Sequence, residues 1–299
     1  MGIYEEIASN KRRSYLLIFA FLIFITFVGY VVGFFYGSGY FGIGLALVIG
    51  IIYFLISYYG GANAILAMTK AKEATKPKYT YLINTVEGLA IAAGLAKPPK
   101  VYVIEDSALN AFATGRDPEH SSITVTTGLL EKLTKLELEG VIAHEMSHIK
   151  NFDIRVMMLA AVMVGLTVLL SDFLLRSFLW GRGGRSRENN QMTAVFIIVG
   201  LALAILAPLV GEAIKLAISR KREYLADASG ALLTRYPKGL ADALKKIRSD
   251  PVPLVDHANK ATAHLFISTP FRKSKKSFMK KLFSTHPPID QRIKKLENM

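Results

Sequence analysis

Hydrophobic residues are concentrated in a few long stretches of this chain. No Asp, Glu, Lys or Arg occurs at residues 14–69, and two apolar stretches lie inside that range, at residues 14–36 and 41–59. Each suits a helix that crosses a bilayer, which needs about 20 apolar residues. The uncharged link at residues 37–40 predicts a helical hairpin with both ends on one side of the membrane. A cleaved signal peptide is the alternative for the first stretch, but that stretch is too long for one.

Two further apolar runs occur later in the chain. Residues 156–171 are short for a full crossing, and residues 192–211 contain Pro208, which kinks helices. The loop between them includes the arginine-rich sequence GRGGRSR. If the third run crosses outward, these arginines oppose the usual excess of basic residues on the cytoplasmic side. These two later runs therefore either cross the membrane despite the arginine-rich loop or only dip into the bilayer. Together with the first two spans, two to four integral membrane helices are expected.

Polar regions at residues 63–153 and 219–299 remain for a soluble part. The first region predicts a helix near residues 79–95. It also contains three short stretches with the pattern of strands, at residues 100–106, 110–115 and 121–128. Thr134 and Glu137 have the spacing of a capping box, which predicts a helix start. The second region is expected to be mostly helical.

The expected fold is therefore mostly α with a small β-sheet, and it combines membrane helices with a soluble domain. The chain divides into four parts. These are an N-terminal transmembrane hairpin at residues 1–62, the first half of the soluble domain at 63–153, a second membrane hairpin at 154–218 and the second half at 219–299.

Charge and composition narrow the class of partner. The net charge is +14, and basic residues gather beside the apolar stretches, at residues 11–13, 70–78 and 220–222. This distribution favours a lipid bilayer with anionic headgroups over nucleic acid, and it predicts that these flanks face the cytoplasm. The chain has no cysteine, so any metal site has to use His, Asp or Glu.

Residues 144–148 read HEMSH. On a helix, His144 and His148 lie on one face and can point at a single ion. Glu145 lies about 100° around the helix from His144, where it can reach a water molecule on that ion. This is the H-E-x-x-H arrangement of zinc peptidases. Two unrelated surface histidines are the alternative, but the capping box independently predicts the helix that the pattern requires.

A third ligand is needed, because a catalytic zinc takes three protein ligands and keeps one position open. Glu223 and Asp227 follow the fourth apolar run in the sequence SRKREYLAD and share a helical face. One carboxylate can bind the ion while the other holds a ligand histidine. Their spacing alone equally allows two surface charges on a basic helix.

The segments HEMSH, REYLAD and THPP, in this order around an apolar hairpin, resemble the HtpX family of membrane-bound zinc metalloproteases, a group that also includes the CAAX prenyl proteases. The similarity extends over nearly the full chain and implies a zincin-like domain facing the cytoplasm. It implies one Zn²⁺ per chain, held by His144, His148 and Glu223. It also implies that Glu145 is the general base and that Asp227 supports a ligand histidine.

The resemblance assigns two further parts of the site. Asn110, Ala111 and Phe112 correspond to a substrate-binding edge strand. His286, in STHPPIDQRI, corresponds to a residue near the site that helps stabilise the oxyanion. From the residues alone, a histidine before two prolines can equally belong to a structural turn.

The expected function is a membrane-anchored zinc endopeptidase of the plasma membrane. It would cleave membrane proteins or misfolded polypeptides at the cytoplasmic face, in membrane protein quality control and the stress response. A CAAX-type prenyl-protein endoprotease is one alternative, although such enzymes usually carry more membrane spans. A non-enzymatic zinc-binding membrane scaffold is another, although Glu145 argues against it because a structural zinc site needs no free base.

Overall fold

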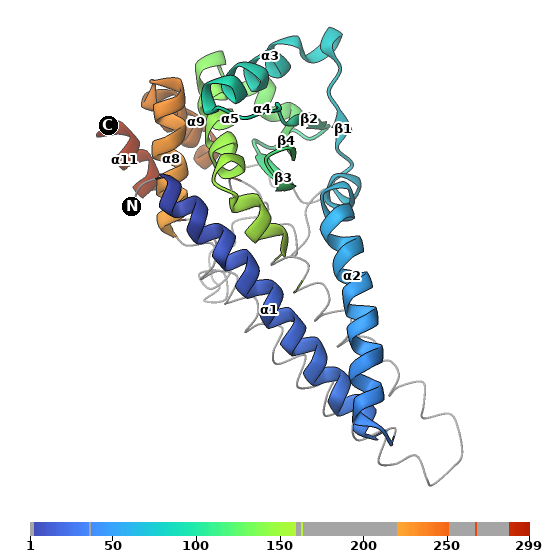
Figure 1. Ribbon diagram of the computed structural model, residues 1–299. Helices are drawn as coiled ribbons and strands as arrows, with labels where there is room; N and C mark the ends of the chain where they lie inside the picture. Colours follow the sequence, from blue (N-terminus) through green and yellow to red (C-terminus); the bar gives the residue numbers. More distant parts are fainter. Residues whose placement is uncertain (1–2, 36, 160–162, 164–219, 251–266, 268–286) are drawn as a thin grey trace. The chain divides into compact units, whose positions relative to one another are not determined.

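The computed structural model of the 299-residue chain describes residues 3–35, 37–159, 163, 220–250, 267 and 287–299 (Figure 1). These residues fall into two compact units. The sheet-bearing unit holds the described residues of 1–11, 61–158 and 217–299, and the hairpin unit holds those of 12–60 and 159–216. Most of the second predicted hairpin, residues 160–162 and 164–218, lies outside the described part of the chain.

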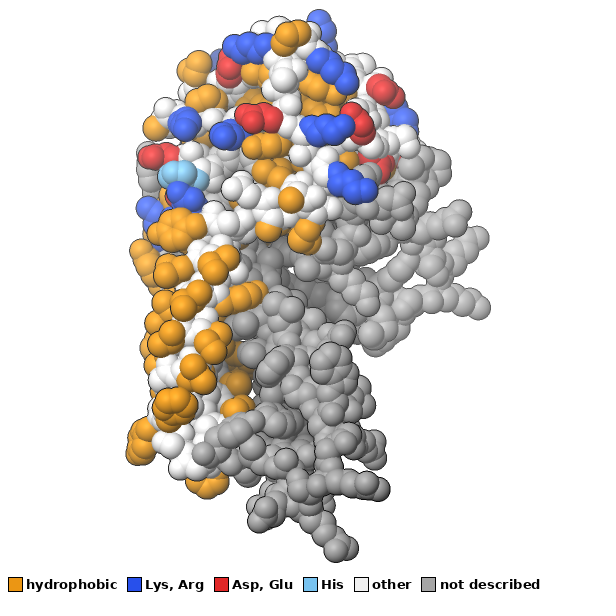
Figure 2. Space-filling view, turned by 90° about the vertical axis from the view of Figure 1, so that its right-hand side faces the viewer, with side chains coloured by type: hydrophobic (Ala, Val, Ile, Leu, Met, Phe, Trp, Pro, Cys, Tyr) orange, Lys and Arg blue, Asp and Glu red, His pale blue; other side chains and the backbone are white. Residues whose placement is uncertain are grey.

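Helices α1 (Ile3–Phe35) and α2 (Gly39–Met68) correspond to the two predicted spans and extend beyond them at their polar ends. Both are long and apolar enough to cross a membrane. A helix of 30 residues is about 45 Å long, which exceeds the hydrocarbon thickness of about 30 Å. Hydrophobic side chains follow α2 in Figure 2, and several are more than half exposed, among them Tyr40, Phe41, Val48 and Ile56. In water such a surface would be costly, whereas lipid covers it without penalty.

Glycines allow α1 and α2 to pack backbone against backbone within the hairpin unit. A Cβ atom added to Gly33 would come within 2.5 Å of the Cα of Gly42, and one added to Gly29 would overlap the side chain of Ala46. Small residues spaced four apart are typical of close helix pairs in membranes, where dispersion contacts replace the hydrophobic effect as the driving force.

The sheet has four strands in the order β1-β2-β4-β3. Strand β2 (Lys100–Ile104) runs parallel to β4 (His120–Thr126) and antiparallel to the short β1 (Lys72–Glu73). Strand β3 (Ala111–Asp117) pairs with β4 as an antiparallel hairpin and forms an edge of the sheet. The three predicted strands are confirmed with ends shifted by a few residues. The predicted helix before them is α3 (Lys76–Ala93), and α4 (Thr127–Lys132) follows β4.

Helix α5 (Lys135–Lys150) begins at the predicted capping box. Thr134 N–H donates to the Glu137 carboxylate over 2.6 Å, and Glu137 N–H donates to the Thr134 hydroxyl over 3.4 Å. Between residues 137 and 149 every side chain except that of Glu139 is buried. A helix buried on all sides lies in the middle of a core, so α5 organises the sheet-bearing unit.

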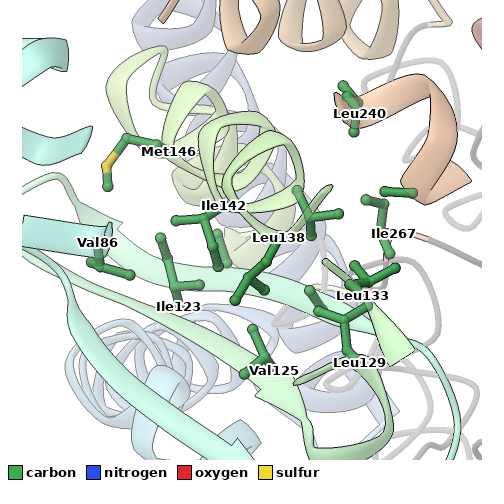
Figure 3. Close-up of a cluster of buried hydrophobic side chains, with 14 of the residues drawn as sticks. Val86, Ile123, Val125, Leu129, Leu133, Leu138, Ile142, Met146, Leu240 and Ile267 are labelled. Atoms are coloured by element: carbon green, nitrogen blue, oxygen red, sulfur yellow. The ribbon is translucent and has the colours of Figure 1, made fainter. Parts of the chain in front are cut away.

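The core face of α5 is formed by Leu138, Ile142 and Met146, which are spaced four apart. Figure 3 shows these side chains directed at Ile123 and Val125 of β4 and at neighbouring apolar residues of α3 and α4. Burying each of these large side chains contributes about 1.5–3 kcal/mol. The sheet therefore fixes the rotation of α5 about its own axis, and with it the direction of the residues on the opposite face.

Helices α8 (Arg220–Thr234) and α9 (Pro237–Ser249) pack against the rest of α5, and α11 (Ile289–Glu297) packs on α9 and α8. Glycines permit two close crossings. A Cβ on Gly140 would lie 2.6 Å from the backbone nitrogen of Leu240 in α9. A Cβ on Gly230 in α8 would lie 3.0 Å from the backbone nitrogen of His144. These crossings set how near the polar residues of α8 come to α5.

We predict that Gly140→Ala destabilises the protein by about 1–3 kcal/mol, because the new methyl group is overpacked against backbone atoms of α9 that cannot rotate away. The measurement is the midpoint of urea unfolding in detergent, followed by circular dichroism. Gly88→Ala on α3 is the matched control, since nothing lies within 4 Å of a Cβ at that exposed position. There the better helix propensity of alanine should stabilise by up to about 1 kcal/mol. Equal shifts of the same sign for both variants would contradict the close crossing.

Candidate metal centre

His144 and His148 lie on the face of α5 that points away from the sheet. Each follows a core residue, Ile142 or Met146, by two positions, which is about 200° around a helix. Both imidazoles are buried, and their ring centroids are 4.7 Å apart at an interplanar angle of 88°. The two Nε2 atoms are 3.2 Å apart. The two histidines therefore converge on one point, as the sequence predicted.

Glu223 of α8 completes the group. Its Oε1 lies 3.6 Å from Nε2 of His148, and its Oε2 lies 3.8 Å from Nε2 of His144. One ligand atom from each of the three residues lies within 4.8 Å of the other two. Two ligands about 2.0–2.1 Å from one zinc ion at a tetrahedral angle are about 3.3 Å apart, so the spacing and the donor types suit such an ion.

The residues of α8 that face α5 are spaced three and four apart. They are Glu223, Asp227 and Gly230, which lie on one side of that helix. Gly230 makes the close approach, and the two carboxylates then reach the histidines. The alternative that Glu223 and Asp227 are surface charges is excluded, because their exposed fractions are 0% and 2%.

Each histidine has a carboxylate on its other ring nitrogen. Asp227 Oδ1 lies 3.0 Å from Nδ1 of His144, and Asp153 Oδ2 lies 2.9 Å from Nδ1 of His148. A carboxylate in this place takes the Nδ1–H of a neutral imidazole and leaves the Nε2 lone pair for a metal. Asp227 was predicted next to a histidine, whereas Asp153 was missed because it follows the turn after α5, beyond any helical spacing from the two histidines.

A buried arginine, Arg292 of α11, was also missed. Its Nη2 and Nε donate to both oxygens of Asp227 over 2.7 and 2.9 Å, and its Nη1 lies 3.5 Å from Glu223 Oε2. The signal was present in the sequence: with Ile289, Ile293 and Leu296, Arg292 forms the face of α11 that packs inward. An arginine on an apolar helix face has to be paired with acidic groups.

The electrostatic balance of the site is negative. The buried groups are four carboxylates, those of Glu145, Asp153, Glu223 and Asp227, and two guanidinium groups, those of Arg222 and Arg292. With neutral histidines, four minus two leaves two uncompensated negative charges among the described residues. Buried charge is costly unless it is paired. A divalent cation bound here would supply two positive charges.

The pKa shifts reflect this excess. Burial acts to lower the pKa of His148, but its hydrogen bond to Asp153 and the charges of Glu223, Asp153 and Glu145 raise it to about 9. Burial acts to raise the pKa of Asp227, yet the Arg292 guanidinium and the hydrogen bond to His144 hold it below its usual range. The carboxylates of Asp227, Glu223 and Glu145 raise the pKa of Arg292.

Glu145 is 2% exposed and belongs to the same electrostatic group, because its charge acts on both His148 and Arg292. It is adjacent to His144 in sequence and lies on a different side of α5 from the shared face of the two histidines. This arrangement suits a carboxylate that acts beside an ion without being a ligand.

The structure describes the predicted substrate-binding residues but not the predicted oxyanion residue. Asn110, Ala111 and Phe112 stand at the start of edge strand β3 and are buried. The carbonyl of Ala111 accepts a hydrogen bond from the backbone N–H of Ile267 over 2.9 Å, so the outer edge of the sheet is covered at this residue. His286 lies outside the described residues.

Comparison with known proteins identifies relatives of nearly full length. The model of peptidase family M48 matches residues 77–299, more than half of the chain. The protease HtpX homolog of Dictyoglomus thermophilum is 48% identical over 299 residues, which cover 99% of this chain and 94% of that protein. The protease HtpX homolog of Listeria monocytogenes is 44% identical over 307 residues, which cover 99% of this chain and 100% of that protein.

One solved structure has a similar fold. The crystal structure of S. mikatae Ste24p superimposes with a TM-score of 0.52 at 19% sequence identity, and the match covers 98% of this chain and 67% of that one. At this identity the likeness concerns the fold alone.

We predict that Asp227→Asn lowers the affinity for Zn²⁺ by about 10–100-fold. The amide directs an N–H group at either Arg292 or His144 and no longer fixes the tautomer of His144. The measurement is competition with a chromophoric chelator on the purified, metal-stripped protein. Asp242→Asn in α9, whose carboxylate pairs only with Lys245 among the described residues, is the control and should bind as wild type. An unchanged affinity in Asp227→Asn would exclude its support of the ligand histidine.

Proposed function

This chain belongs to peptidase family M48 and is a membrane-anchored metalloprotease, and we propose that its ion is zinc, held by His144, His148 and Glu223. The observation that carries the proposal is the convergence of three buried ligand atoms of the types that zinc prefers. Two of the ligands come from α5 and the third from α8, so folding of the sheet-bearing unit is what assembles the set.

The proposed reaction is hydrolysis of a peptide bond. A divalent ion in this position would act as a Lewis acid toward the scissile carbonyl and would acidify a water molecule. Glu145 would accept a proton from the attacking water and deliver it to the leaving amine. Asp227 and Asp153 would hold the two imidazoles in place, and Arg292 would keep Asp227 ionised. His286, by the family resemblance, would help to stabilise the oxyanion.

The substrate is proposed to bind as an extended strand along β3. Because the Ala111 carbonyl points away from β4, the main chain of Ala113, two residues further on, points the same way. Because Ile267 already pairs with the Ala111 carbonyl, a polypeptide would add to the outward main-chain groups from Ala113 onward, with Asn110 and Phe112 at the near end of this ladder. Main-chain pairing is insensitive to side-chain identity, so cleavage of many sequences is expected.

The proposed substrates are membrane proteins and misfolded polypeptides, cleaved at the cytoplasmic face of the plasma membrane in protein quality control under stress. The positive flanks at residues 11–13 and 70–78 support this orientation and contact with anionic headgroups. The relatives of full length are named protease HtpX homologs, so this reading is favoured over a CAAX-type prenyl-protein endoprotease. A non-enzymatic scaffold does not fit a member of a peptidase family.

We predict that Glu145→Gln keeps the bound metal but lowers kcat/KM by about 10²–10⁴-fold, because the amide cannot accept the proton. The measurements are digestion of casein in detergent and metal content by mass spectrometry. Glu139→Gln, the same change on the same helix at a residue that pairs with Tyr81, is the matched control and should be fully active. Full activity of Glu145→Gln would remove it from the mechanism.

We predict that Glu223→Ala purifies with much less than one zinc per chain, since two histidines alone form an incomplete site. Metal content is again the measurement. Glu131→Ala, which removes an exposed carboxylate from α4, should retain the wild-type content. Wild-type metal content in Glu223→Ala would exclude Glu223 from the ligand set.

A further inference from the structure

A polar residue of the N-terminal helix reaches the metal centre through two hydrogen bonds. Asn10 of α1 has an exposed fraction of 0%. Its Nδ2 donates to the Asp153 Oδ1 and to the backbone carbonyl of Asn151, each over 2.8 Å. These partners are more than 140 positions away in the sequence and flank the turn that follows α5. Both hydrogen bonds lie within the sheet-bearing unit, to which residues 1–11 belong.

Asp153 uses its two oxygens for different tasks. Oδ2 faces Nδ1 of His148 over 2.9 Å, and Oδ1 accepts from Asn10 and from Arg222 Nη1 over 3.0 Å. Two donors on Oδ1 fix the rotation of the carboxylate and leave Oδ2 directed at the imidazole. Arg222 neighbours Glu223 in the sequence, so this one carboxylate joins the N-terminus, the turn after α5 and the start of α8.

The turn itself needs outside support. Phe152 has a φ of +61°, which is rare for a residue with a large side chain and persists only where the surroundings hold it. Lys11 Nζ lies 4.8 Å from the centroid of the Phe152 ring, and the Arg155 guanidinium lies 5.0 Å from it. Asn10 and Lys11, adjacent residues of α1, therefore contact the two residues of the turn and Asp153, where the chain becomes helical again. The middle one of these three, Phe152, is in a conformation that does not hold by itself.

We infer that Asn10 is a positioning residue of the metal centre, which sets the Asp153 carboxylate and thereby the orientation of His148. The inference rests on the proposed role of His148 as a metal ligand. It gives the N-terminal helix a part in the chemistry beyond anchoring. A carboxylate free to rotate would hold His148 in more than one orientation, so the site would bind the ion more weakly and in a less regular geometry.

The test compares Asn10→Ala and Asn10→Asp with wild type, using metal-stripped full-length protein in detergent. Asn10→Asp keeps the shape of the side chain, removes both donors and places a negative charge against Asp153. Zn²⁺ affinity is expected to fall by about tenfold in Asn10→Ala and by more in Asn10→Asp. The visible absorption of the Co²⁺-loaded protein, which reports ligand geometry, should shift in both variants. A purely structural Asn10 would leave this spectrum unchanged.

Asn84→Ala on α3 is the control, because it removes an asparagine that is exposed. A double-mutant cycle tests whether Asn10 acts through Asp153. If it does, Asn10→Ala should lower the Zn²⁺ affinity little further in a protein that already carries Asp153→Ala. The cycle does not use Asn10→Asp, so it still tests the inference if that variant does not fold. Additive losses in the cycle, or wild-type affinity and Co²⁺ spectrum in folded Asn10→Ala, would overturn the inference. His148→Ala tests the premise separately: if it binds Zn²⁺ as tightly as wild type, the proposed ligand set and the inference both fall.

Discussion

The excess of buried negative charge around His144 and His148 is the constraint on which the sheet-bearing unit depends. Among the described residues four carboxylates and two guanidinium groups are buried there, and an excess of buried negative charge is costly without a counterion. These six groups come from four parts of the chain: α5, the segment directly after it, α8 and α11. The groups come together only when all these segments are packed, so a divalent cation bound among them would couple metal binding to folding.

The helix packing follows from the same requirement. A carboxylate of α8 can approach an imidazole of α5 only if the two backbones come close, and Gly230 provides the space beside His144. On its other side α5 is fixed by the row of Leu138, Ile142 and Met146 against the sheet. Hydrophobic packing thus sets the rotation of α5 and glycine sets the distance to α8. The ligands need little further adjustment, which is how a rigid metal site is built from ordinary helices.

Some features of this fold could be predicted because the residues that produce them lie within one or two helical turns of each other in the sequence. The capping box at Thr134, the spacing of His144 and His148, and the shared face of Glu223 and Asp227 all depend on the helical period, and all are present in the structure. The contacts of Asp153, Arg222 and Asn10 had no such signal. They join segments that are far apart in the sequence, and a turn or a single asparagine at a helix end carries no periodicity. Arg292 was predictable only in part. Its position on the apolar face of a helix indicates burial, but nothing in the sequence indicates that its partner is Asp227.

The raised pKa of His148 shows how strongly the surrounding carboxylates act on this imidazole. Burial acts to lower this pKa, but the hydrogen bond to Asp153 and the neighbouring carboxylates favour the imidazolium and raise the pKa to about 9. An entering divalent ion needs the Nε2 lone pair and therefore has to displace that proton. Among the described residues one proton would compensate only half of the excess, because four carboxylates are buried there with two guanidinium groups. The site is consequently best neutralised by a doubly charged ion on neutral imidazoles. The Nδ1 partners Asp153 and Asp227 are placed to hold both rings in the tautomer that such an ion requires.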